Sequence, residues 1–113
     1  MSIAIPAHLE VSGLMRAVES AGGFAMVIRK GQREAGAILV VLLEKGANAR
    51  VYERIAHMDG SRGWTLMKAQ DPEKLDEINE YLTRREGQDP DLWIVELDIA
   101  NGERFIGLTA AEG

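Results

Sequence analysis

Hydrophobic positions recur at a helical spacing in two segments of the chain. Between Leu9 and Ala21 they return every three or four residues, and Gly22 and Gly23 follow, which predicts a helix that ends at these glycines. A second helix is predicted to begin at Asp71-Pro72-Glu73, because aspartate, proline and glutamate all favour a first turn, and to end near Gly87. Its predicted buried stripe consists of Leu75, Ile78, Tyr81 and Leu82.

Five other segments carry patterns that are typical of strands. These segments are residues 24–28, 38–43, 50–55, 64–68 and 92–99. Ile38–Leu43 is apolar on both alternating faces, so we expect a central strand that is buried above and below. The turn residues at 45–48 and 59–63 connect the second, third and fourth segments, which predicts an antiparallel meander.

The end of the chain contains a strong turn signal. Asn101-Gly102 predicts a tight hairpin, after which Glu103–Ile106 would fold back on the last strand. The chain after about residue 107 is expected to be a frayed tail.

These patterns predict one compact α+β domain over residues 1–113. We expect a mainly antiparallel sheet of about five strands, with two helices packed mainly on one face. Because Ile38–Leu43 is apolar on both faces, the second face then needs a cover, and a homodimer is predicted to supply it. Curvature of the sheet or the C-terminal tail are alternative covers.

The composition limits the class of protein. With 46% apolar and 27% charged residues, the chain can bury a core. It contains no cysteine, so disulfides, thiolate zinc sites and a cysteine nucleophile are excluded. Residues 1–10 lack the pattern of a signal peptide, and the longest apolar run, Ala35–Leu43, is far shorter than the ~20 residues of a membrane span. A cytoplasmic protein without membrane association is expected.

Charge is distributed unevenly along the chain. The net charge is −5; residues 1–70 carry nine basic and six acidic side chains, and residues 71–113 carry four and twelve. The negative total argues against broad binding to nucleic acids or anionic membranes. The simplest interpretation of this asymmetry is a solvated acidic helix. The alternatives are attraction between opposite faces in a dimer, or an acidic surface for a basic protein partner.

The loop at 57–62 contains side chains that are used in nucleophilic catalysis. His57, Asp59 and Ser61 are a base, an acid and a hydroxyl, and Arg62 adds a cation that suits an anionic ligand. A catalytic triad requires geometry that composition does not establish. The simpler interpretation is a turn in which Asp59 and Ser61 bond to nearby backbone.

The basic residues Arg29, Lys30 and Arg33 are the second candidate site. Around Gly31 they are predicted to form an anion site if backbone N–H groups point inward. The alternative is a solvated hairpin tip whose charges discourage aggregation. His8 and His57 are the only histidines and lack the spacing of a metal motif, so we expect neither a metal site nor a cofactor.

Several blocks along the chain resemble a known family. They are Gly23-Phe24-Ala25, Arg29-Lys30-Gly31, residues 35–40, Arg62-Gly63-Trp64 and Asp89-Pro90-Asp91-Leu92-Trp93-Ile94-Val95-Glu96. Together they resemble the bacterial domain-of-unknown-function family 1491 over nearly the whole chain. Gln32 departs from the pattern, in which an acidic residue commonly follows the glycine, so no role of that carboxylate is transferred. The resemblance implies a compact bacterial domain and supplies no reaction, cofactor or partner.

The residues together favour a non-enzymatic cytoplasmic binding or assembly module, because no coherent catalytic constellation is present. The alternative is a small enzyme or anion-binding protein that uses the 57–62 loop or the 29–33 hairpin tip. Trp93 is predicted to be a folding residue, since the last strand uses its alternating apolar side chains to cover the core.

Overall fold

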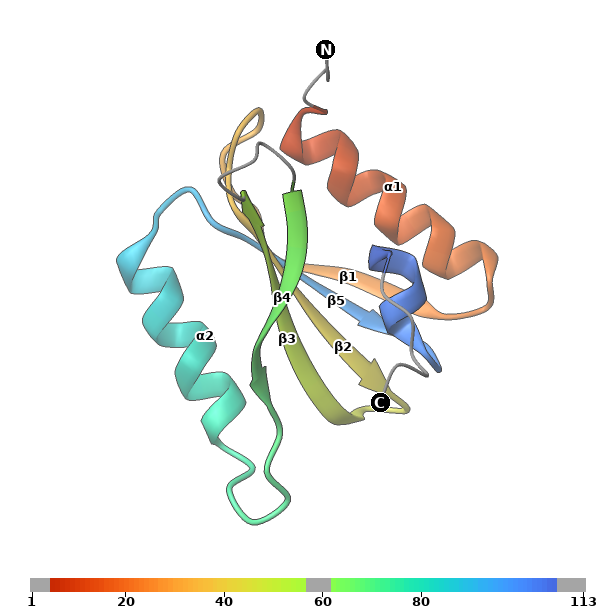
Figure 1. The fold of residues 1–113 in the computed structure, drawn as a ribbon, viewed down its shortest axis with the longest axis vertical. Coiled ribbons are helices and arrows are strands. Elements are labelled where there is room, and N and C mark those ends of the chain that lie inside the picture. The colour runs from red at the N-terminus through yellow and green to blue at the C-terminus, as the bar shows by residue number, and fades with distance from the viewer. Residues whose placement is uncertain (1–4, 57–61, 108–113) are drawn as a thin grey trace.

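The computed structural model describes residues 5–56 and 62–107, without the side chains of residues 55, 56 and 62. Two helices and a short 3-10 helix surround a five-stranded sheet (Figure 1). In chain order the elements are α1 (Ala7–Ser20), β1 (Phe24–Arg29), β2 (Ile38–Glu44), β3 (Ala47–Ala56), β4 (Arg62–Ala69), α2 (Glu77–Gln88), β5 (Trp93–Asp98) and η1 (Gly102–Ile106). The predicted α+β class is confirmed. The predicted frayed tail lies outside the described residues.

The strand order is β1-β5-β2-β3-β4, with β1 and β4 at the edges. The meander from β2 to β4 is antiparallel, as predicted, and β2 is the central strand. The interpretation of residues 29–33 as the tip of a hairpin is wrong, because β5 lies between β1 and β2 and runs parallel to β2. β5 is mostly buried on both faces, which is typical of an inner strand of a sheet that is covered on each side.

Each face of the sheet is covered by one helix. α1 packs on one face through Val11 and Val18, and α2 packs on the other through Ile78 (Figure 1). The prediction that both helices lie mainly on one face is therefore wrong. The central strands β2 and β5 are apolar on both faces, so burying them requires a cover on each side.

Two local predictions near the second helix are corrected. α2 begins at Glu77, and residues 71–76 form turns in which a carboxylate oxygen of Asp71 accepts the N–H of Glu73 at 2.9 Å. Asp71 thus stabilises a turn before the helix rather than its first residues. Leu75 lies in that segment and is exposed instead of joining the buried stripe.

The predicted hairpin at Asn101-Gly102 is also wrong, and η1 forms there instead. Asn101 has a positive φ of 54°, but Gly102 does not adopt a positive φ, which a two-residue hairpin turn of this type requires at both positions. A Cβ at Gly102 would lie 2.9 Å from the side chain of Leu42. The glycine therefore permits η1 to approach β2, and Ile106 joins the core under α1.

Candidate functional site

The basic turn predicted at 29–33 is a loop that contacts the start of β5. Arg29 donates to the carbonyl oxygen of Pro90 at 3.0 Å, and its guanidinium lies 3.6 Å from Glu86 of α2. Lys30 is exposed. Arg33 is exposed and lies 3.7 Å from Glu34. The three cations therefore do not converge on one point.

The backbone of this loop is occupied by internal hydrogen bonds. The backbone N–H of Gln32 donates to the backbone carbonyl oxygen of Asp91 at 3.0 Å. The side-chain oxygen of Gln32 accepts the N–H groups of Glu34 and Ala35 at 2.9 and 2.6 Å. These amides are thus used within the loop, and no observation favours an anion there. Anion binding by Arg29, Lys30 and Arg33 stays a prediction.

The other predicted site falls mainly outside the described residues. His57, Asp59 and Ser61 belong to segment 57–61, which the structure does not describe. Arg62 is the first residue of β4, and its side chain is not described either. Within residues 5–56 and 62–107, no group of three or more metal-ligating side chains occurs. The catalytic hypothesis for this loop stays a hypothesis.

Three of the family-like blocks, at residues 29–31, 35–40 and 89–96, meet in space around the start of β5. A Cβ at Gly31 or at Gly36 would lie 2.3 Å from the carbonyl oxygen of Asp91, so the loop must be free of side chains at both positions. The indole N–H of Trp93 donates to the carbonyl oxygen of Gln32 at 2.7 Å, and the residue is only 4% exposed. Trp93 is a core residue, as predicted, and these blocks fix the fold where loop and strand meet.

The titratable groups with shifted pKa values belong to internal ion pairs. Hydrogen bonds from Arg50 lower the pKa of Glu103, although its burial acts in the opposite direction. Burial, together with the hydrogen bond to Glu103, raises the pKa of Tyr52. A hydrogen bond to Glu53 raises the pKa of Arg85. These contacts connect η1 and α2 to β3, so the shifts reflect structural contacts.

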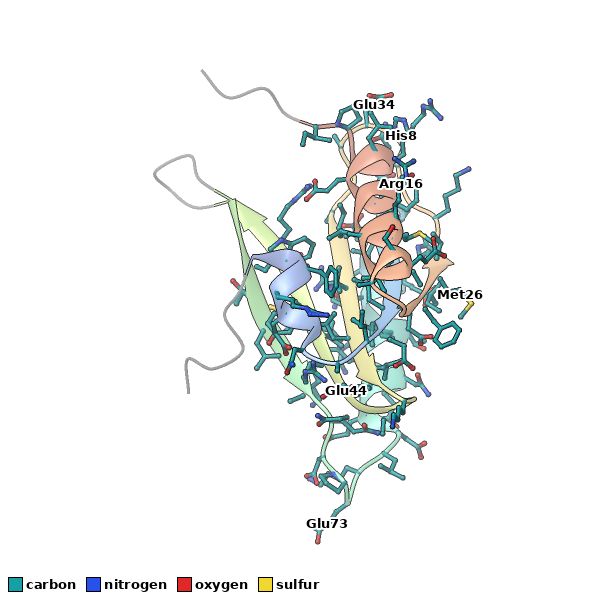
Figure 2. All side chains as sticks on the ribbon, turned by 90° about the vertical axis from the view of Figure 1, so that its right-hand side faces the viewer. His8, Arg16, Met26, Glu34, Glu44 and Glu73 are labelled. Carbon is teal, nitrogen blue, oxygen red and sulfur yellow. The ribbon has the colours of Figure 1, made fainter. Side chains whose placement is uncertain are left out.

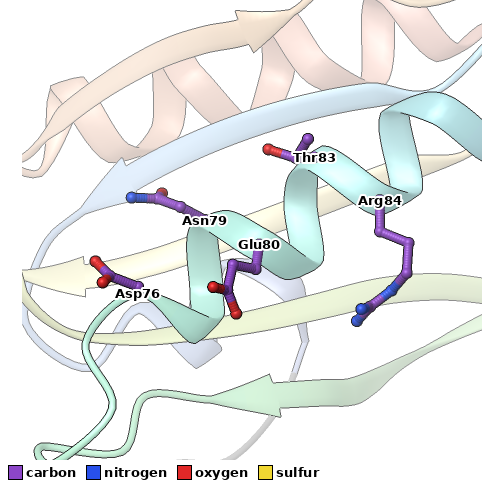
Figure 3. Close-up of a pocket in the computed structure, with 5 residues that line it drawn as sticks. All are labelled: Asp76, Asn79, Glu80, Thr83 and Arg84. Carbon is purple, nitrogen blue, oxygen red and sulfur yellow. The ribbon is translucent and has the colours of Figure 1, made fainter.

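The outer surface of α2 offers only an open depression. Its lining comes from a single helix, and the side chains point outward rather than toward one another (Figure 3). These residues are Asp76, Asn79, Glu80, Thr83 and Arg84. A surface made by one convex helix cannot enclose a ligand, so we assign no site to it.

A second cavity lies beyond the carboxyl ends of the parallel strands β2 and β5. It has a volume of about 420 Å³, and Phe24, Lys45 and Ile99 are among its lining residues. The carboxylate of Asp98 accepts the backbone N–H groups of Lys45 and Gly46 at 2.8 and 2.9 Å. This carboxylate therefore holds the β2–β3 turn, and it is not free to bind a ligand.

The most unusual surface is the β1 edge, which we define as residues 24–28. Four of its five residues, all apolar, are exposed: Phe24 by 77%, Met26 by 52%, Ile28 by 45% and Val27 by 37%. Met26 extends from the outer edge of the sheet into solvent (Figure 2). Edge strands are normally protected by charges, prolines or bulges. Residues 24–28 carry no charge and no proline, and the bulge of β1 lies at one end of this segment, between Val27 and Arg29.

The hydrogen bonds of β5 show which of its residues face β1. The N–H groups of Trp93 and Ile99 donate to carbonyl oxygens on the β2 side of the sheet. Because alternate residues of a strand bond to opposite neighbours, Glu96 and Asp98 direct their backbone groups toward β1.

The β1 edge consequently has unpaired backbone groups. In the register with β5, Met26 and Phe24 lie opposite the two residues that face β1, so they form the ladder. Ala25 and Val27 alternate with them, and their N–H and C=O groups therefore point away from the sheet. This edge combines open backbone with exposed apolar side chains, and it is the candidate functional site.

Sequence reasoning predicted β1 as a strand but missed its role. The alternation in residues 24–28 indicates a strand without indicating its place in the sheet. The available signal was the short length of the apolar run at residues 24–28, which does not identify an edge by itself. The edge position follows from the insertion of β5, which is a long-range contact.

Comparisons with known proteins agree on one family. The family model described as a protein of unknown function, DUF1491, matches residues 5–107. A crystal structure of a DUF1491 family protein from Caulobacter crescentus CB15 is 32% identical, with a TM-score of 0.78, and the match covers 91% of this chain and 95% of that one. An NMR structure of a DUF1491 family protein from the same organism is 31% identical over 94% and 96%, also with a TM-score of 0.78.

A third solved structure, protein Atu0922 from A. tumefaciens, is 28% identical over 95% of this chain and 96% of that one, with a TM-score of 0.76. No curated protein matches the chain. Neither α1 nor α2, the two α-helices of the described residues, is long and apolar enough to span a membrane. The match of the family model over residues 5–107 shows that the chain belongs to the DUF1491 family.

Proposed function

We propose that this protein is a non-enzymatic, cytoplasmic binding module whose working surface is the β1 edge. A partner polypeptide adds to β1 as a further antiparallel strand, and its apolar side chains pack on Phe24, Met26 and Ile28. The single observation that carries this proposal is the outward backbone of Ala25 and Val27 beside these exposed side chains.

Strand addition suits this edge for a physical reason. Main-chain hydrogen bonds supply affinity without regard to sequence, and alternating side chains supply specificity. The exposed apolar residues lose contact with water when a strand covers them. This burial stabilises the complex by about 25 cal/mol per Å² of apolar area. One added strand forms a small interface, and small interfaces are usually weak and transient. We therefore expect a dissociation constant in the micromolar range, on the order of 1–100 μM.

The test is a selection of random ten-residue peptides against the immobilised protein, followed by fluorescence anisotropy of the selected peptides. We expect peptides with alternating apolar residues, and at least tenfold weaker binding to Met26→Lys. Leu66→Lys is the matched control, because Leu66 is 50% exposed on β4, the other edge of the sheet. Equal losses in both variants, or none in Met26→Lys, would contradict the proposal.

A backbone variant separates strand addition from simple hydrophobic contact. Val27→Pro removes an N–H that points away from the sheet, so the ladder with β5 remains while one hydrogen bond to the added strand is lost. We expect binding of the selected peptides to fall by a similar factor. Unchanged binding would show that the peptides contact side chains without extending the sheet.

A further inference from the structure

We infer that the occupant of the β1 edge is a second copy of this chain, paired antiparallel about a twofold axis at Met26. The sheet then continues from one copy into the other. This inference rests on the proposed function and adds the identity of the partner.

The first argument is the register of the backbone. Antiparallel pairing about Met26 places Ala25 opposite Val27 of the partner subunit, so the outward N–H and C=O groups of each exchange hydrogen bonds. Registers centred on Ala25 or on Val27 also bring outward groups together, but they leave part of the apolar segment unpaired. Only the register at Met26 places all five residues of the β1 edge against one another, with the bulge between Val27 and Arg29 at each end of the contact.

The second argument is the pattern of side chains on this edge. Met26 shares its face of the sheet with Glu96, its partner on β5, and this face is the one that α2 covers over the neighbouring strands. In the register at Met26, Phe24 lies opposite Ile28 of the partner subunit, and the two Met26 side chains adjoin at the axis. The three most exposed side chains of β1 in each copy thereby contact apolar groups instead of water.

The third argument is charge at the two ends of the strand. Lys30 follows β1, and Glu19 lies in the last turn of α1, where its carbonyl oxygen accepts the N–H of Gly22. Both side chains are exposed, and among the described residues neither makes an ion pair. Antiparallel pairing brings the end of β1 that leads to Lys30 beside the end that follows Glu19 of the partner subunit, so charges of opposite sign lie near each other at both ends of the contact. A parallel arrangement would bring like charges together instead.

The inferred dimer uses a different surface from the dimer that was expected from the sequence. That expectation required an uncovered face of the sheet, whereas α1 and α2 cover one face each. The inferred contact uses the edge and leaves both helices in place. Its central residue is therefore exposed in the monomer, and substituting it does not disturb the core.

The absence of cysteine from the chain allows a direct test by single-site cross-linking. Met26→Cys places two thiols at the axis, in a non-hydrogen-bonded pair whose Cα atoms are about 4.5 Å apart, which lies within disulfide range. We expect mild oxidation to link Met26→Cys at least tenfold faster than Leu66→Cys, which is equally exposed on β4. Equal rates would overturn the inference.

Sedimentation equilibrium of the wild type and of charge variants completes the test. The apparent molecular mass of the wild type is expected to rise with protein concentration from 12.4 kDa toward twice that value. Lys30→Glu and Glu19→Lys should each weaken the dimer several-fold, and the double variant should restore it. A wild type that stays at 12.4 kDa, or a dimer that Met26→Lys does not weaken, would overturn the inference.

The two proposals fail differently. A monomeric wild type that binds selected peptides at the β1 edge contradicts the second copy and supports strand addition by another partner. A monomer that binds no peptide at this edge contradicts both. Chemical denaturation of Met26→Lys serves as the folding control, because an exposed substitution should leave the free energy of unfolding within about 0.5 kcal/mol of the wild type.

Discussion

Strands β1 and β3 use polar and apolar side chains in opposite ways. On β3, three charged residues each connect the sheet to one covering element: Arg50 to Glu103 of η1, Glu53 to Arg85 of α2, and Arg54 to Glu10 of α1. On β1, residues 24–28 carry no charge and four of the five are exposed. The charged side chains of β3 thus connect the sheet to the elements that cover it, whereas apolar side chains of β1 face solvent.

The same contrast separates β1 from the other edge of the sheet. β4 also exposes Leu66 and Met67, but the polar residues Thr65 and Lys68 flank them, and Lys68 lies 3.5 Å from Glu77 of α2. Charged side chains on an edge oppose pairing with another chain. The two edges therefore differ in protection rather than in exposure alone, and β1 is the edge available to a partner.

Substitution of the buried residue Trp93 is expected to have the largest effect on the free energy of unfolding. Its ring is 4% exposed, and its indole N–H is bonded to Gln32. Trp93→Ala should lower the free energy of unfolding by about 3–5 kcal/mol, because it leaves a cavity and removes the hydrogen bond to the carbonyl oxygen of Gln32. Urea denaturation measures this, and a loss below 1 kcal/mol would contradict the assignment to the core.

Breaking a β3 contact should have an intermediate effect. Arg50 donates to both carboxylate oxygens of Glu103, at 2.8 and 3.0 Å, and both side chains are mostly buried. Glu103→Ala removes two hydrogen bonds of the Arg50 guanidinium, which should lower the free energy of unfolding by about 1–3 kcal/mol in urea denaturation. The matched variant Glu73→Ala removes an exposed carboxylate in a turn and should change little.

The same ion pair predicts how stability depends on pH. The pKa of Glu103 lies below its ordinary value of 4.5 in the folded state, mainly because Arg50 donates hydrogen bonds to it. Its contribution to stability is therefore complete above pH 4.5 and is lost as the pH falls through the lower folded pKa. The midpoint temperature of thermal unfolding, measured from pH 6 down to pH 2, should fall more steeply in the wild type than in Glu103→Gln. Parallel curves would contradict the pairing.

The smallest effect on stability is expected at the β1 edge. Phe24→Ser should change the free energy of unfolding by no more than about 0.5 kcal/mol, because the side chain is 77% exposed. The same variant should weaken peptide binding and self-association. A loss of stability comparable to that of Trp93→Ala would show that Phe24 belongs to the core, and the contrast between the two strands would fail.

Local patterns predicted most of the elements, because periodicity depends on neighbours in sequence. The apolar run Ile38–Leu43 correctly indicated a central strand, and the alternation in 92–99 indicated β5 and the burial of Trp93. The position of β5 between β1 and β2 could not be predicted in this way. It depends on contacts between segments that lie far apart in the chain, and from it follow the exposed edge and the need for one helix on each face.

The candidate site was missed for the same reason. The sequence indicated an anion site at Arg29, Lys30 and Arg33 because of their charge. In the structure, however, backbone N–H groups of this loop donate to the side-chain oxygen of Gln32. The outward backbone of Ala25 and Val27 becomes visible only when the ladder with β5 is known. Charge and motif are properties of single segments, whereas an open edge is a property of the sheet.

Amide hydrogen exchange at individual residues of β1 tests the central claim most directly. Phe24 and Met26 direct their N–H groups to β5 and should be protected at every protein concentration. Ala25 and Val27 should exchange rapidly in dilute protein and slow by at least tenfold in concentrated protein, with no such change at Leu66 on β4. If Ala25 and Val27 exchange equally fast at all concentrations, a second copy does not pair with this edge, and the account is contradicted.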